Sequence, residues 1–162
     1  MRGLLSHTAV LLALCLASGP GVWSQDRPQA AGRSELAQPG SGPEEVAAKL
    51  REAASQHAII GIYLDEGRYE SVPDEFQRIL DLGLSGANEK LVVQAAWQIV
   101  EKLREAKRYG VAHQVVDMTL EQALEVENQF SLLMLRGKIF QDQKLYSQAI
   151  QAVREAQRLK PR

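Results

Sequence analysis

The sequence predicts an all-α protein made of about three stacked antiparallel helix hairpins. Three times, a basic residue or a glycine leads into a tyrosine that opens a new apolar stretch, at residues 67–69, 107–109 and 144–146. An amphipathic stretch stands before and after each tyrosine, which is the pattern of a repeated helix–turn–helix hairpin. No segment alternates apolar and polar residues as a strand does, and the sequence contains no Asn-Gly or Asp-Gly turn.

Length and composition are those of an ordinary globular protein. The chain has 162 residues, enough for about one domain, of which 45% are hydrophobic and 24% charged. Lysine and arginine number 19 against 20 aspartate and glutamate residues. Because no dense basic stretch is interleaved with aromatic residues, we expect no nucleic acid among its partners.

Residues 1–24 have the features of a secretory signal peptide. Arg2 supplies the positive charge, and the apolar run over residues 9–17 is much shorter than the roughly 20 residues that cross a bilayer. Residues 22–24 place the cleavage site before Gln25. We therefore expect an exported protein, periplasmic or secreted, with no stable membrane insertion after cleavage.

Cys15 offers a competing interpretation, a lipoprotein signal, which is disfavoured because Leu14 stands where such signals carry a small residue. A non-cleaved N-terminal anchor is the other alternative. Cys15 is the single cysteine of the chain. Its removal with the signal would leave neither a disulfide nor a thiolate metal site, so core packing alone would stabilise the mature chain.

A linker is predicted over residues 25–42, which are rich in Gln, Pro, Gly, Ser and Ala and show no apolar periodicity. The helical domain is expected over residues 43–162. Its first helix runs from about Glu45 to Glu66, with Pro43 in the first turn and Gly67 as a stop.

The later helices follow from apolar spacing at helical period. The second starts at Ser71 and ends at Gly83, and no Gly or Pro separates the fourth from the fifth, so that break is placed near residues 127–128. Leu91 is expected to point inward, as is Ile150. The third to sixth helices are expected over about residues 89–107, 110–124, 128–143 and 146–159.

The segment from Phe130 to Pro161 resembles a tetratricopeptide repeat. The two earlier hairpins match this pattern less well, because Ile60 and Val100 replace the small residue of the first helix, and the resemblance covers about residues 53–162. The departures within the last repeat are Leu133, Arg136 and Val153. The matching residues are Gly137, Phe140, Tyr146, Ala149, Ala156 and Pro161.

The resemblance implies a short α-solenoid in which the first helix of each pair lines a concave groove. Such a groove would bind a peptide or helix of a partner protein without catalysis, and we expect Trp97 to be its main apolar contact, although Trp97 could equally pack in the core. The groove residues implied are His57, Gly61 and Leu64, then Gln94, Trp97, Glu101 and Arg104, then Met134, Lys138 and Gln141.

Two other functions are weighed against this adaptor. A self-associating structural subunit is suggested because no further solvating helix follows the last repeat. A homo-oligomer is therefore kept as an alternative. A hydrolase or metal enzyme would need His57 and His113 to meet acids in one pocket, yet neither stands at a fixed spacing from a second ligand or a nucleophile. We therefore expect no enzyme, no cofactor and no metal.

Overall fold

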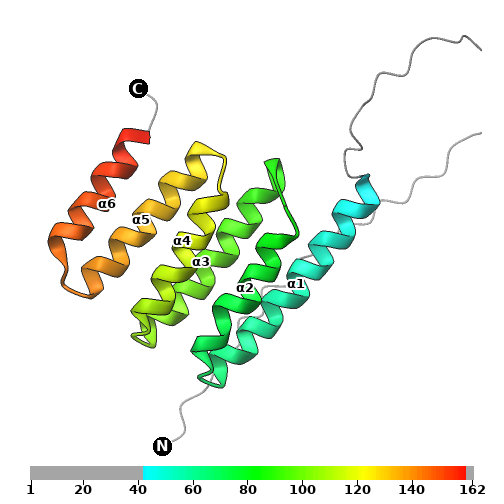
Figure 1. Cartoon of the computed structure of the whole chain (residues 1–162), viewed down its shortest axis with the longest axis horizontal. Coiled ribbons are helices and arrows are strands. Elements are labelled where there is room, and N and C mark those ends of the chain that lie inside the picture. Colours follow the sequence, from blue (N-terminus) through cyan, green and yellow to red (C-terminus); the bar gives the residue numbers. More distant parts are fainter. Residues whose placement is uncertain (1–41, 160–162) are drawn as a thin grey trace, which may run out of the picture. The chain divides into compact units, whose positions relative to one another are not determined.

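A computed structural model describes residues 42–159, and this part of the chain consists of helices joined by short turns (Figure 1). The predicted all-α fold is confirmed. The predicted signal peptide, and the predicted linker up to residue 41, lie outside the described residues. The helices are α1 Pro43–Asp65, α2 Val72–Asp81, α3 Glu89–Glu105, α4 Tyr109–Gln122, α5 Val126–Asp142 and α6 Tyr146–Leu159, with short 3-10 turns at Tyr69–Ser71 and Gly86–Asn88.

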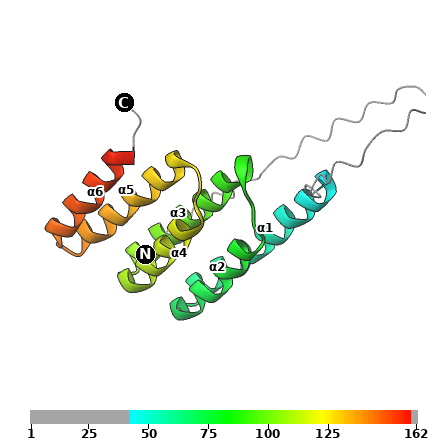
Figure 2. The same ribbon diagram turned by 45° about the horizontal axis from the view of Figure 1, so that its top comes forward.

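The helices pack in sequential pairs: α1 with α2, α3 with α4, and α5 with α6. The first helices of the pairs also pack in series, α1 on α3 and α3 on α5, while α2 packs on α4. Figures 1 and 2 both place α1 and α6 at opposite ends of this row. Within the described residues, α6 packs broadly against α5 but has no comparable contact with α4.

The three tyrosine turns share one geometry. In each, a residue in the left-handed region ends the first helix: Gly67 at φ 74°, Lys107 at φ 58° and Lys144 at φ 62°. The predicted stop at Gly67 is therefore confirmed. The next backbone N–H donates to a carbonyl five residues earlier: Arg68 to Tyr63, Arg108 to Leu103, and Leu145 to Phe140. This common turn sets the register of the hairpins, which are offset by 40 residues and then by 37 residues.

Lys107 and Lys144, whose φ angles are positive, allow the steric cost of this turn to be tested. Glycine adopts positive φ without the steric cost that a Cβ imposes, roughly 1 kcal/mol. We expect Lys144→Gly to raise the free energy of unfolding by up to about 1 kcal/mol, measured by urea denaturation. The control is Lys138→Gly in the middle of α5, which should lower it by about 1 kcal/mol. A destabilised Lys144→Gly chain would contradict the proposed origin of the turn.

The core is continuous from α1 to α5 and contains large side chains with no solvent exposure, among them Ile60, Phe76 and Leu135. Two expectations about inward residues are wrong. Leu91 is 44% exposed, because the buried stripe of α3, which includes Val92 and Val93, faces away from it. Ile150 is 53% exposed, because α6 packs on α5 through Ala152 and Ala156.

Helices α5 and α6 approach each other closely at Gly137. A Cβ built there would lie 3.3 Å from Val153 Cγ2 and 3.6 Å from the Ala149 carbonyl oxygen. These distances leave little room for a side chain, since 3.3 Å is shorter than most contacts of a real Cβ. The absence of a side chain at this position lets the two helices pack together.

The break between α4 and α5 lies earlier than predicted. The expected position near residues 127–128 is wrong: α4 ends at Gln122, Ala123 and Glu125 have extended backbone, and α5 starts at Val126. The reason is a buried side chain far away in the sequence. Glu89, at the start of α3, accepts hydrogen bonds from the backbone N–H groups of Leu124 and Glu125, both at 3.1 Å.

Candidate partner-binding surface

The first helices of the three hairpins are joined by charged side chains across their shared surface. Lys102 on α3 lies 3.3 Å from the Asp65 carboxylate on α1. Lys138 on α5 lies 3.6 Å from the Glu101 carboxylate on α3. These pairs are at least a third exposed, so each contributes little to stability, but together they make a polar surface that continues across α1, α3 and α5.

Arg104 is the best-paired charge on this surface. Its guanidinium donates to Asp142 at 2.7 Å and to Glu101 at 2.6 Å, and its side chain is only 15% exposed. The hydrogen bond to Asp142 is the main factor that raises the pKa of Arg104 above its usual value; burial opposes the rise, and Glu101 adds to it. Arg104 is therefore a fixed positive charge that links α3 to α5.

Trp97 lies between core and surface. It is half-buried and packs against the hydrophobic core, as one of the two sequence-based interpretations expects. On the surface side, the Lys138 ammonium lies 5.0 Å from the centroid of the ring, within the range of a cation–π interaction. Glu101, one turn further along α3, contacts the same lysine.

The groove residues expected on α1 differ in their surroundings. Leu64 is 7% exposed and belongs to the core cluster, so its expected place on the groove surface is wrong; it lies on the stripe of α1 that faces the neighbouring helices. His57 and Gly61 are half-buried. Burial lowers the pKa of His57 below its usual value, and the positive charge of Lys102 lowers it further.

The lowered pKa of His57 predicts a pH-dependent stability. An unfolded histidine takes up a proton at about pH 6.5, and the folded one only at lower pH. The contribution of His57 to folding is therefore complete above about pH 6.5 and is lost as pH falls toward the folded pKa. We expect NMR titration to give a His57 pKa below 6.5 and Lys102→Gln to raise it. An unchanged His57 pKa in Lys102→Gln would contradict the contribution assigned to Lys102 and leave burial as the cause.

Met134, Lys138 and Gln141 line a shallow surface groove between α5 and α6. The other wall comes from α6 and includes Tyr146, 60% exposed, and Ile150, 53% exposed. Thus three of the expected groove residues line one surface depression. Its second wall is α6, whereas the resemblance implies a groove lined by the first helices alone. The expected residues Gln94 on α3 and Gln141 on α5 are exposed.

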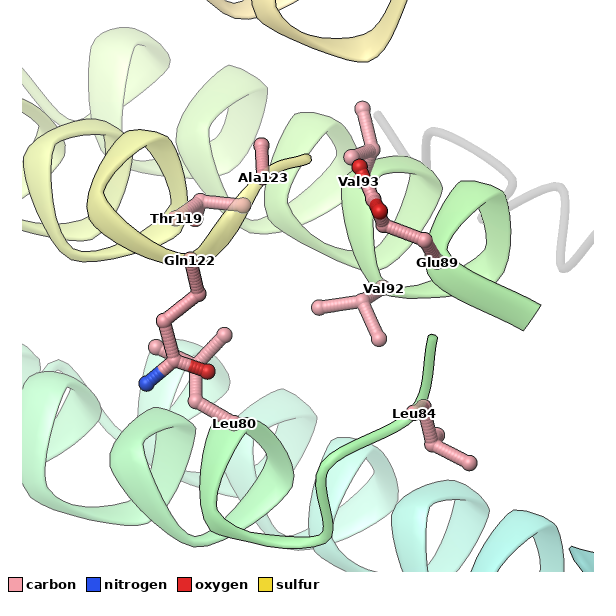
Figure 3. A pocket seen from close by; sticks show the side chains of 8 residues that line it. All are labelled: Leu80, Leu84, Glu89, Val92, Val93, Thr119, Gln122 and Ala123. Carbon is pink, nitrogen blue, oxygen red and sulfur yellow. The ribbon is translucent and has the colours of Figure 1, made fainter. Parts of the chain in front are cut away.

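A second depression, enclosed by α2, α3 and α4, is too small for an organic ligand. Its volume is about 30 Å³, which matches one or two water molecules. Figure 3 shows Glu89 and Ala123 lining it from opposite sides, with Leu80 and Val92 completing the apolar wall. This site has a structural role: Glu89 is 5% exposed, and its Oε1 accepts a further hydrogen bond from Asn128 Nδ2 at 2.9 Å.

The described residues hold no group of three or more His, Cys, Asp or Glu side chains placed to bind a metal ion. His113 contacts Gln143 and the ring of Phe140. Of the helices between residues 42 and 159, none is long and apolar enough to cross a membrane.

Comparison of the chain with family models, with curated proteins and with solved structures finds no match.

Proposed function

We propose that this protein is a non-catalytic interaction module that binds a segment of a partner protein along the surface of α1, α3 and α5. The tetratricopeptide resemblance of its last hairpin implies the same use of the first helices. The partner segment would be a peptide or a helix.

The observation that carries the proposal is the position of Trp97. One side of the indole packs on the core, which limits its motion, and the other side meets Lys138 at the surface. Tryptophans of this kind, rigid and flanked by polar groups, dominate the energetics of many protein interfaces. Glu101 and Arg104, with fixed geometry beside it, would set the polarity of the bound segment.

Site-specific photo-crosslinking tests which surface meets the partner. A photo-reactive amino acid replaces Gln94 or Gln141 in the full chain, both of which are exposed on the first helices. The matched control replaces Gln114, an exposed glutamine on α4. We expect one and the same partner to be captured from Gln94 and Gln141, and not from Gln114.

Trp97→Ala then tests the energetic role of the indole. We expect the affinity of the captured partner to fall at least tenfold, while circular dichroism shows an unchanged helix content. If the partner binds Trp97→Ala as tightly as the parent, or crosslinks equally from Gln114, the first-helix surface is not the binding site.

A further inference from the structure

The hairpin α5–α6 exposes a face whose counterpart in each of the two earlier hairpins is covered by the hairpin that follows. We name it the terminal face and define it by Met134 and Lys138 on α5 and by Tyr146, Ile150, Val153 and Arg154 on α6. In Figures 1 and 2, α6 lies at the end of the row of helices. The groove between α5 and α6 runs along this face.

The offset of 37 residues relates each position on the terminal face to one in the middle hairpin. Tyr109 and Ala112 correspond to Tyr146 and Ala149, and Val116 corresponds to Val153. Ala112 and Val116 are 0% exposed, because α5 packs on α3 and α4. The first hairpin follows the same rule, since Phe76, the counterpart of Val116, is 0% exposed. The terminal face thus has the apolar residues of a helix-stacking surface.

Charge distinguishes the terminal face from the inner one. At the inner interface, Asp117 on α4 lies 2.7 Å from Arg136, and Glu101 on α3 lies 3.6 Å from Lys138. Both acids belong to the middle hairpin and both bases to α5. In the last hairpin, the counterparts of Asp117 and Glu101 are Arg154 and Lys138. The signs are reversed: this stacking surface is basic where the inner one is acidic.

From this juxtaposition we propose that the terminal face docks an acidic amphipathic helix of a partner protein. That helix lies between α5 and α6 as α5 lies between α3 and α4. It carries carboxylates at positions i and i+2, where α5 carries Arg136 and Lys138. Residues two apart on a helix point about 200° apart, so one carboxylate meets Arg154 and the other meets Lys138 on the opposite wall.

A second copy of the chain fits this face less well. Stacked end to end, it would offer α1, in which the counterparts of Arg136 and Lys138 are Ile59 and Gly61. Neither carries a charge. Stacked about a two-fold axis, two terminal faces would bring Lys138 and Arg154 together with their own copies, which is repulsive. Charge complementarity therefore selects a different, acidic helix.

The test uses a peptide with the sequence of residues 126–143 and Glu in place of Arg136 and Lys138. The unmodified peptide, which keeps both bases, is the matched control. We expect the full chain to bind the acidic peptide about tenfold more tightly at low salt, since two attractive pairs replace two repulsive ones. NMR shifts should change at Tyr146 and Ile150.

Charge reversal on the protein completes the test. We expect Arg154→Glu to abolish the preference for the acidic peptide, and Arg51→Glu, an exposed charge on α1, to leave it intact. Equal affinity for the two peptides, a preference that persists in Arg154→Glu, or shifts confined to residues around Trp97 would each overturn the proposal. Lys138 belongs to both surfaces, but Arg154 and Ile150 lie only on the terminal face, so failure here leaves the proposed function of the first-helix surface standing.

Sedimentation tests the remaining alternative, in which a second copy of the chain occupies the terminal face. We expect the full chain to be a monomer at micromolar concentration, with or without Ile150→Lys. A dimer that Ile150→Lys dissociates would overturn the acidic-helix proposal and assign the terminal face to self-association.

Discussion

Glu89→Ala is expected to lower the free energy of unfolding by about 3 kcal/mol, because it removes a buried acceptor of charge-assisted hydrogen bonds. Glu89 Oε1 accepts from the backbone N–H groups of Leu124 and Glu125 and from the side chain of Asn128. The two amides would lose this acceptor in the loop where α4 ends. Urea denaturation followed by circular dichroism measures the change, and thermal unfolding should shift down by about 10 °C.

Glu89→Gln separates the acceptor from its charge. Glutamine keeps one side-chain oxygen near the amides, so we expect it to recover about half of the lost stability. Glu121→Ala, an exposed glutamate on α4, should change stability by less than about 0.5 kcal/mol. If Glu89→Ala is as mild as Glu121→Ala, the hydrogen bonds to the α4–α5 loop do not stabilise the fold.

Phe76→Ala should cost about 3–5 kcal/mol, the range for a large aromatic side chain removed from a core. Phe76 is 0% exposed and lies on α2, which packs on α1 of its own hairpin and on α4 of the next. The cavity would open between two hairpins, and neighbouring hairpins depend on each other for burial. We expect the urea midpoint to fall sharply, or the first hairpin to unfold separately from the rest.

The matched control is Val153→Ala at the corresponding position of α6. Val153 is only half-buried, and among the described helices no further hairpin covers it. We expect a loss of less than about 1.5 kcal/mol. A comparable loss at both positions would show that burial by a following hairpin is not what stabilises this site.

The number and order of the helices could be predicted because their signals are local. The tyrosine turns, Gly67 and the helical spacing of apolar residues each specify structure within a few residues. The α4–α5 break was misplaced because its cause is not local: Glu89 lies 35 residues before the loop it binds. A lone glutamate at a helix start gives no sequence signal of such a distant hydrogen bond.

The candidate site was predicted less completely than the fold. The helical positions of the resembling repeat predict Trp97, Glu101 and Arg104 on one first helix and Lys138 on the next. In the structure, Lys138 on α5 contacts Trp97 and Glu101 on α3, and Glu101 also pairs with Arg104. Register alone could not show that Leu64 is buried or that Arg104 pairs with Asp142, since both depend on how the hairpins tilt against each other. The exposure of Ile150 depends on whether another helix packs there, which periodicity within α6 cannot reveal.

Helix α6 packs mainly on α5, and this has a consequence for how the protein unfolds. Among the described helices, α3 is held by α1, α4 and α5, whereas α6 is held by α5. Opening of α6 separates one principal helix–helix interface, whereas opening of α3 separates three, so the amide hydrogens of α6 should exchange with solvent at a lower free-energy cost than those of α3. Those of α3 should exchange only when the whole array opens. A partner helix that docks on α6 would slow the exchange of the α6 amides and reduce this difference between α6 and α3. Deuterium uptake of α6 would therefore report binding of the partner.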